Sequence, residues 1–311
     1  MSDLAILQAA FAALDRLQLY YDDAIPWAAI EQGFAHGGEG VHFASRAIGI
    51  FKPAQMERGV LSIKTVVPRS GRINIYDDHQ ASGDYYRYSL QAGGAHKGAN
   101  KFLWQAKELN QPFIYFYGVF PGFYTALWPC YVDAIYDRGI SDSFCDVYVG
   151  ANISENFLPP LEEGKYILPD TIERRYAIRD SKVRLHQSYF RQAVLSAYRN
   201  RCAMTGLPMA RLLDAAHIIP DAAMDGEASV RNGIALSKLH HSAFDKHLIG
   251  IDPDFRIHIS DEVMQSNDGP LLELGLKALH QREICLPGQR ENWPDRGFLD
   301  RRYEAFCKEA G

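Results

Sequence analysis

The chain has 311 residues, of which 47% are hydrophobic and 23% are charged, and its formal net charge is −5. This composition is that of a globular protein, and it excludes a disordered or collagen-like chain. At roughly 100–200 residues per domain, two domains are expected. The net acidity excludes a uniformly basic surface for nucleic acids, so a basic patch has to be sought in individual segments.

The cysteine content and the absence of a signal peptide predict a cytoplasmic protein. The chain has five cysteines, an odd number, and no two of them form a CxxC pair. Reduced, mostly buried thiols are therefore expected rather than a disulfide framework or a cysteine-based zinc knuckle. The first residues lack the basic segment that opens a secretory signal.

One uncharged stretch, residues 113–132, is long enough to suggest a membrane span. It contains Gly118, Pro121 and Gly122, which are typical of turns and interrupt helices. We therefore predict two buried strands around a turn at Pro121-Gly122, and no contact with a membrane.

The N-terminal half is predicted to be rich in strands. An amphipathic helix is expected from about residue 3 to 17, and the β-rich runs 60–67, 72–76 and 85–90 follow it. Short strands separated by turn signals predict a compact β-barrel or a strongly curved sheet. The predicted fold class is therefore α+β, with a β-barrel-like domain and flanking helices over residues 1–155.

The composition changes near residue 155. Residues 156–170, which include Pro159-Pro160, are expected to form a linker, and a second domain follows over 171–311. Its first segment, residues 171–201, has a net charge of +6 within an acidic chain. Clustered Lys and Arg side chains are typical of a surface that contacts phosphates, although a solvated helix face is the alternative. The residues predicted to bind nucleic acid here are Arg174, Arg175, Arg179, Lys182, Arg184 and Arg191.

Three ordered motifs lie between Cys202 and Ile259. They read AAHIIP with His217, NGIALS with Asn232, and LHHSAFD with His241. The pattern predicts a strand, a loop, a second strand and a helix. The separations, 15 and then 9 residues, suit that arrangement. This combination resembles the HNH (ββα-metal) endonucleases, and most of all the McrA-like restriction enzymes among them.

The resemblance implies hydrolysis of phosphodiester bonds and a role for each motif residue. His217 would be the general base, because a histidine near its pKa can accept the proton of the attacking water. His241 would be a metal ligand, and Asn232 would brace the loop between the strands as part of the catalytic machinery. The alternatives are that His217 is a core histidine, that His241 is a surface histidine and that Asn232 belongs to a plain Asn-Gly turn.

The chain departs from many HNH enzymes at Ala216, where the family often has an Asp or His that binds metal. Asp214 and Asp245 are the candidate replacements, and Asp245 lies one helical turn after His241. Each could instead be a structural partner. An oxygen-rich site favours Mg²⁺ or Mn²⁺, whereas more imidazoles would allow Ni²⁺ or Zn²⁺, and we favour Mg²⁺. His240 is a candidate phosphate contact, with a plain surface histidine as the alternative.

The N-terminal half is also dense in aromatic residues, and proteins that hold a flipped base stack it between aromatic rings. A β-rich module followed by an HNH unit resembles modification-dependent restriction enzymes. We therefore predict double-stranded, modified DNA as the partner, and we leave open whether the protein is a homodimer. The aromatic residues could also simply fill a core. The residues of the predicted modified-base pocket are Tyr85, Tyr86, Trp104, Tyr117, Tyr124 and Trp128.

The tail is expected to form two helices, residues 271–280 and about 299–308, that pack against the nuclease core without contributing chemistry. The predicted function is thus a metal-dependent endonuclease of restriction type. Two alternatives remain: a nucleic-acid-binding module whose HNH unit has lost activity through Ala216, and a defence nuclease that a small ligand activates.

Overall fold

The computed structural model describes residues 3–67, 85–139, 142–150, 161–162, 165–166, 171–220, 229–267 and 269–309. The chain divides into two compact units, residues 1–188 and 189–311, which are described separately. The division falls within one long helix, α4 (Thr171–Ala197). The predicted strand 72–76 and most of the predicted linker 156–170 lie outside the described residues.

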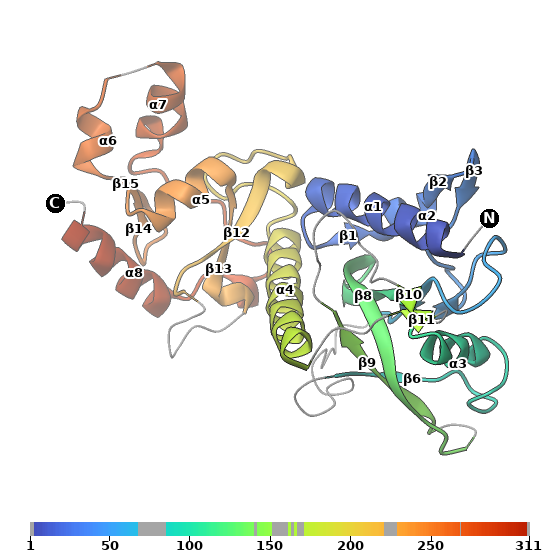
Figure 1. The fold of residues 1–311 in the computed structure, drawn as a ribbon. Helices are drawn as coiled ribbons and strands as arrows, with labels where there is room; N and C mark the ends of the chain where they lie inside the picture. Colours follow the sequence, from blue (N-terminus) through green and yellow to red (C-terminus); the bar gives the residue numbers. More distant parts are fainter. Residues whose placement is uncertain are drawn as a thin grey trace. The chain divides into compact units, whose positions relative to one another are not determined.

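The N-terminal unit is built around a seven-stranded sheet with the order β4-β5-β7-β8-β9-β6, and β1 also pairs with β8. Figure 1 labels β1, β6, β8 and β9 of this sheet. The sheet is curled into a half-barrel, which agrees with the predicted α+β fold with a strongly curved sheet, and β4 and β6 do not pair with each other among the described residues. The elements are α1 (Asp3–Tyr21), β1 (Ile25–Pro26), α2 (Trp27–Gln32), β2 (Phe34–His36), β3 (Glu39–Val41), β4 (Ile50–Phe51), β5 (Ser62–Lys64), β6 (Tyr86–Ser89), α3 (Asn100–Glu108), β7 (Phe113–Phe120), β8 (Phe123–Tyr136), β9 (Phe144–Val149), β10 (Leu161–Glu162) and β11 (Lys165–Tyr166).

The uncharged stretch forms two antiparallel strands, as predicted. β7 and β8 pair up to Phe120 and Phe123, and the turn between them contains Gly122 with φ +83°. Both faces of these strands are buried: Tyr115 and Tyr117 pack on one side together with residues of α3, and Phe116 packs on the other together with residues of α1. Burial on both faces explains why the stretch carries no charge. No helix among the described residues is long and apolar enough to cross a membrane.

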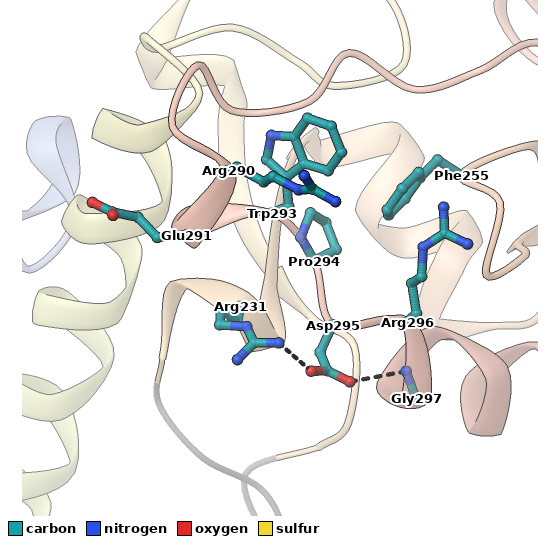
Figure 2. A pocket seen from close by; sticks show the side chains of 9 residues that line it. All are labelled: Arg231, Phe255, Arg290, Glu291, Trp293, Pro294, Asp295, Arg296 and Gly297. Atoms are coloured by element: carbon teal, nitrogen blue, oxygen red, sulfur yellow. Dashed lines mark hydrogen bonds and ion pairs between the residues drawn. The ribbon is translucent and has the colours of Figure 1, made fainter.

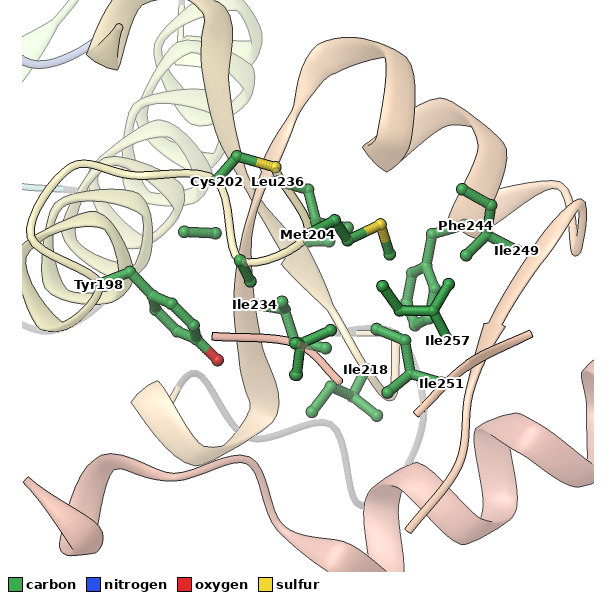
Figure 3. Close-up of a cluster of buried hydrophobic side chains, with 14 of the residues drawn as sticks. Tyr198, Cys202, Met204, Ile218, Ile234, Leu236, Phe244, Ile249, Ile251 and Ile257 are labelled. Atoms are coloured by element: carbon green, nitrogen blue, oxygen red, sulfur yellow. The ribbon is translucent and has the colours of Figure 1, made fainter. Parts of the chain in front are cut away.

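In the C-terminal unit, two antiparallel strand pairs, β12-β13 and β14-β15, and several helices surround one hydrophobic core. The core joins side chains of α4 to those of the following strands and helices, among them Ile234, Phe244 and Ile257 (Figure 3). After α4 come η1 (Ala210–Leu212), β12 (Leu213–His217), η2 (Val230–Asn232), β13 (Gly233–Ser237), α5 (Lys238–Asp245), β14 (Ile249–Ile251), β15 (Ile257–Ile259), α6 (Asp261–Gln265), α7 (Pro270–Gly275), η3 (Lys277–Leu279), η4 (Arg290–Asn292) and α8 (Arg296–Glu309).

The tail differs in detail from its prediction. The first expected helix is split into α7 and the short 3₁₀ turn η3, and Gly275 ends α7. The second begins earlier than predicted, at Arg296, because the Asp295 carboxylate accepts hydrogen bonds from Gly297 N and Phe298 N at the start of α8.

Candidate active site

The three motif residues lie on β12, η2 and α5. β12 and β13 pair antiparallel from Leu213↔Ser237 to His217↔Gly233. His217 is the last residue of β12, Asn232 directly precedes β13, and His241 lies on α5. The helix begins where it does because Ser237 caps it, its hydroxyl accepting a hydrogen bond from His240 N.

Asn232 connects the beginning of β13 to the segment that follows His217. It is fully buried. Its Oδ1 accepts a hydrogen bond from Ile219 N at 2.9 Å, and its Nδ2 donates to Ile219 O at 2.9 Å. Its carbonyl oxygen also accepts from Ile218 N at 2.9 Å. The following Gly233 is extended, with φ −132°, so this is not a plain Asn-Gly turn.

His217 packs flat against an aromatic ring of α4. Its imidazole lies 3.8 Å from the Phe190 ring, centroid to centroid, with an angle of 12° between the planes. A Cβ added to Gly233 would lie 2.4 Å from Val194 and 2.9 Å from Phe190. Glycine at this position therefore allows α4 to approach the strand pair and hold the His217 ring. Phe190 was not among the site residues predicted from the sequence.

His241 lies between both candidate carboxylates. Its Nδ1 is 3.1 Å from Asp214 Oδ2, and its Nε2 is 3.2 Å from Asp245 Oδ2. The hydrogen bonds to Asp214 and Asp245 raise the pKa of His241 to about 9, although burial opposes this shift. The hydrogen bond from His241 also lowers the pKa of Asp245. Burial alone would raise the pKa of Asp214, but the hydrogen bond from His241 is among the interactions that lower it.

Two arginines stand at the outer sides of these carboxylates. Arg191 Nε is 3.5 Å from Asp214 Oδ1, and Arg302 Nη2 is 3.8 Å from Asp245 Oδ1. Alternation along β12 puts Asp214 on the same face as Ala216. The face of β12 that carries Ala216 thus still presents a carboxylate, that of Asp214, two residues earlier in the strand.

The donor atoms here suit a small divalent cation, although they are not arranged as a metal centre. No group of three or more His, Cys, Asp or Glu side chains in the described part of the chain is placed to hold a metal ion. Both ring nitrogens of His241 face carboxylates. A cation bound to one ring nitrogen of His241 would have one carboxylate beside it, that of Asp214 at Nδ1 or that of Asp245 at Nε2, and the second carboxylate would have to turn toward it. Two carboxylates and one imidazole are donors that Mg²⁺ and Mn²⁺ accept.

Two predicted nucleic-acid contacts are directed into the protein instead. Arg191 is only 17% exposed, and besides Asp214 it donates to the carbonyl oxygens of Leu213 and Ala210. His240 is 4% exposed, with Nδ1 2.8 Å from Ser237 Oγ and Nε2 2.9 Å from Gly275 O. The burial of His240 and the inward hydrogen bonds of Arg191 argue against direct contact of these two side chains with DNA.

The remaining basic residues of the segment stay predicted nucleic-acid contacts. Lys182 and Arg184 are half-buried on the part of α4 that belongs to the N-terminal unit. The side chains of Arg174, Arg175 and Arg179 lie outside the described residues.

His240 takes part in a buried network that sequence reasoning missed. Cys202 Sγ lies 3.5 Å from His240 Nδ1, and Ser237 N donates to the same sulfur at 3.4 Å. Burial would raise the pKa of the Cys202 thiol, but hydrogen bonds from His240 and Thr205 lower it to about 6. These contacts fix the start of α5, which positions His241 on the following residue.

The six aromatic residues of the predicted base pocket do not form one cage. Tyr86 and Tyr117 are buried in the core on one face of the sheet, with Tyr85 packed against it, whereas Tyr124 and Trp128 are buried in the core on the other face. Trp104 stacks on His96, and its Nε1 donates to Ala95 O. At least four of them serve to fill the cores, which was the alternative interpretation.

Comparison with known proteins identifies the segment that carries the motif. Residues 202–252 match the family model described as HNH endonuclease. The chain therefore contains an HNH endonuclease domain and is a nuclease, as predicted. That segment includes His217, Asn232 and His241, together with Asp214 and Asp245.

Among solved structures, the "Modification dependent TagI restriction endonuclease" is similar to this chain with 14% sequence identity and a TM-score of 0.28, over 82% of this chain and 84% of that chain. A TM-score this low does not establish a common fold for the whole chain. No curated protein matches it.

Proposed function

We propose that the chain is a metal-dependent DNA endonuclease that acts as a modification-dependent restriction enzyme. The observation that carries the proposal is the arrangement of His217, Asn232 and His241 on a strand, a turn and a helix inside the HNH domain, with two carboxylates at His241. That arrangement supports the proposed roles of His217 as general base, of Asn232 as a brace for the backbone beside it, and of His241 with the two carboxylates as metal ligands.

In this mechanism His217 accepts the proton of the attacking water. The flat contact with Phe190 fixes the plane of its imidazole. Asn232 holds residues 218 and 219, so the backbone that leaves His217 has one conformation. A base held in one orientation loses less entropy when it reaches the transition state.

Asp214, His241 and Asp245 would hold the cation, and we propose Mg²⁺ or Mn²⁺. When bound, the cation would stabilise negative charge on the phosphate and on the leaving oxygen. Arg191 would keep Asp214 oriented, because its guanidinium is itself fixed by the carbonyl oxygens of Leu213 and Ala210. The arginine predicted to contact DNA thus becomes a positioning residue for a metal ligand.

Selection of the target would belong to the N-terminal unit. An HNH unit of this size offers little surface for sequence recognition, and the chain has a separate compact unit of 188 residues before it. The free cysteines agree with the cytoplasmic location expected of a restriction enzyme, which remains a prediction.

Cleavage of plasmid DNA tests the catalytic part of the proposal. With Mg²⁺ present, the wild-type chain should cut, and EDTA should stop it. His217→Ala should slow cleavage about 10²–10⁴-fold while DNA binding survives, since loss of a general base typically costs that much. His42→Ala, which removes an exposed histidine of the N-terminal unit, is the control and should cut normally.

Wild-type cleavage by His217→Ala would contradict its role as base. DNA binding by the wild-type chain with no cleavage under any divalent cation would support the alternative of an inactive HNH module. Plasmids carrying cytosine, 5-methylcytosine or 5-hydroxymethylcytosine, cut side by side, test selection. Equal cleavage rates on all three plasmids would show that these two cytosine modifications do not select the target.

A further inference from the structure

We infer that the tail of the C-terminal unit contains a second DNA-contacting surface, a groove that binds the phosphate backbone. This rests on the proposed action on DNA. The groove, which we call the arginine groove, has a volume of about 490 Å³ and is lined by Arg231, Arg290 and Arg296 together with Phe255 and Trp293 (Figure 2). No chemistry was predicted for this tail from the sequence.

Two aromatic rings support the arginines. Trp293 and Phe255 meet edge to face with centroids 5.9 Å apart, and the indole N–H of Trp293 donates to Pro287 O at 2.8 Å. The guanidinium of Arg290 lies 5.8 Å from the Trp293 ring, and that of Arg296 lies 5.1 Å from the Phe255 ring. A guanidinium held against an aromatic face still presents its N–H groups to a ligand.

The acidic residues nearby leave the positive charge of Arg290 and Arg296 available to a phosphate. Asp295 is engaged by Arg231 at 2.5 Å and by the first amides of α8. Arg296 pairs with Asp254, but the two side chains are 62% and 74% exposed, and such a pair is weak enough for a phosphate to displace it. Arg290 has no carboxylate within ion-pair distance among the described residues. The side chain of Glu291 points away from the Trp293 ring (Figure 2).

The groove is attached directly to the HNH motif. Asp295 N donates to Arg231 O at 2.9 Å, and Arg231 immediately precedes Asn232, which holds the backbone beyond His217. DNA bound in the groove would therefore contact the same short segment that braces the proposed base. This connection makes a DNA strand a better occupant than an unrelated anion.

The chemistry of the lining also favours nucleic acid. Arginine forms paired hydrogen bonds with phosphate oxygens, which a lysine cannot reproduce. Aromatic faces beside such arginines offer stacking to an exposed base. We therefore assign Arg290 and Arg296 as phosphate contacts. Arg231 is left out of the test because it also pairs with the residue that caps α8.

The test measures how salt weakens binding of the full-length chain to a labelled DNA duplex in EDTA. Arg290→Ala/Arg296→Ala should bind at least about 10-fold more weakly at low salt. It should also lower the slope of log K against log salt by about 2, because each lost phosphate contact contributes about 0.9. Arg290→Lys/Arg296→Lys should retain most of the slope but not the full affinity. Melting temperatures of all variants should match that of the wild type, since both arginines are exposed.

Arg282→Ala/Arg301→Ala is the matched control, because both arginines are exposed in the same unit and do not line the groove. It should bind almost as tightly as the wild type. An unchanged affinity and slope in the Arg290/Arg296 variant, with a wild type that binds DNA, would overturn the inference and leave the proposed function intact. An equal loss in the control would also overturn it, because net charge would then explain the effect. A wild-type chain that binds no DNA would end both proposals.

Discussion

At the scale of single residues, Asn232 allows a sharp test of the brace. In the wild type, Asn232 accepts a hydrogen bond from Ile219 N and donates one to Ile219 O. Asn232→Asp keeps the acceptor but replaces the donor with a carboxylate oxygen that faces Ile219 O. We expect a loss of unfolding free energy of about 1–3 kcal/mol, the cost of leaving a buried polar group unpaired. Cleavage should slow while DNA affinity stays the same. Urea unfolding measures the loss of stability, and single-turnover cleavage measures the loss of rate. A variant as stable as the wild type would show that the brace formed by Asn232 is not needed.

The sequence predicted which residue types would meet, but not the directions of the long side chains. Asp214 and Asp245 were expected near His241, and both contact it. Arg191 was counted with a basic surface, yet its guanidinium turns inward to backbone carbonyls. His240 was expected outside, yet the Ser237 cap and Cys202 hold it in the core. The number of charges in a segment does not predict the contacts of Arg191 and His240, because their partners lie elsewhere in the chain.

At the scale of elements, the approach of α4 to the strand pair depends on Gly233. A methyl group there would lie 2.4 Å from Val194 and 2.9 Å from the Phe190 ring that stacks on His217. Gly233→Ala should therefore cost about 1–3 kcal/mol of stability through overpacking and should slow cleavage by displacing the imidazole. Thermal melting and cleavage rates measure both effects.

Gly269→Ala is the control for that prediction. No heavy atom lies within 4 Å of a Cβ added there, so stability and activity should change little. Full activity in Gly233→Ala would mean that the contact between Phe190 and His217 does not matter for catalysis.

The elements themselves followed the sequence where the local signals were strong. The turn at Pro121-Gly122 and the two strands around it were predicted, because glycine and proline interrupt an otherwise apolar run. The assignment of the aromatic residues to one pocket was not supported. In β7 and β8, the period of two sends Tyr117 to one face of the sheet and Tyr124 to the other. Which face is covered depends on the helices α1 and α3, whose packing no local pattern specifies.

At the scale of the whole molecule, the chain divides into its two compact units within helix α4. The sequence suggested an N-terminal domain that ends at residue 155, because the composition changes there. The compact unit extends to residue 188 and includes the first part of α4. Leu185 of that helix is 5% exposed within the core that also contains Tyr86 and Tyr117. A domain that ended at residue 155 would thus lack part of this core. A change in composition does not reveal that Leu185 packs against residues far earlier in the chain.

A fragment of residues 1–188 should therefore be more stable than a fragment of residues 1–155. The shorter one loses the burial of Leu185, worth about 1.5–3 kcal/mol, and leaves the Tyr86 hydroxyl without Ser181 Oγ, its partner at 2.8 Å. It also loses the hydrogen bond from Ser188 Oγ to Asp23 O. At about 2–4 °C per kcal/mol for a chain of this size, its melting temperature should fall by several degrees. Ser181→Ala in the longer fragment is the matched control and should show a part of that loss, because it removes the hydroxyl and keeps the helix. Equal melting of the two fragments would place the end of the N-terminal unit at residue 155 and assign α4 to the nuclease.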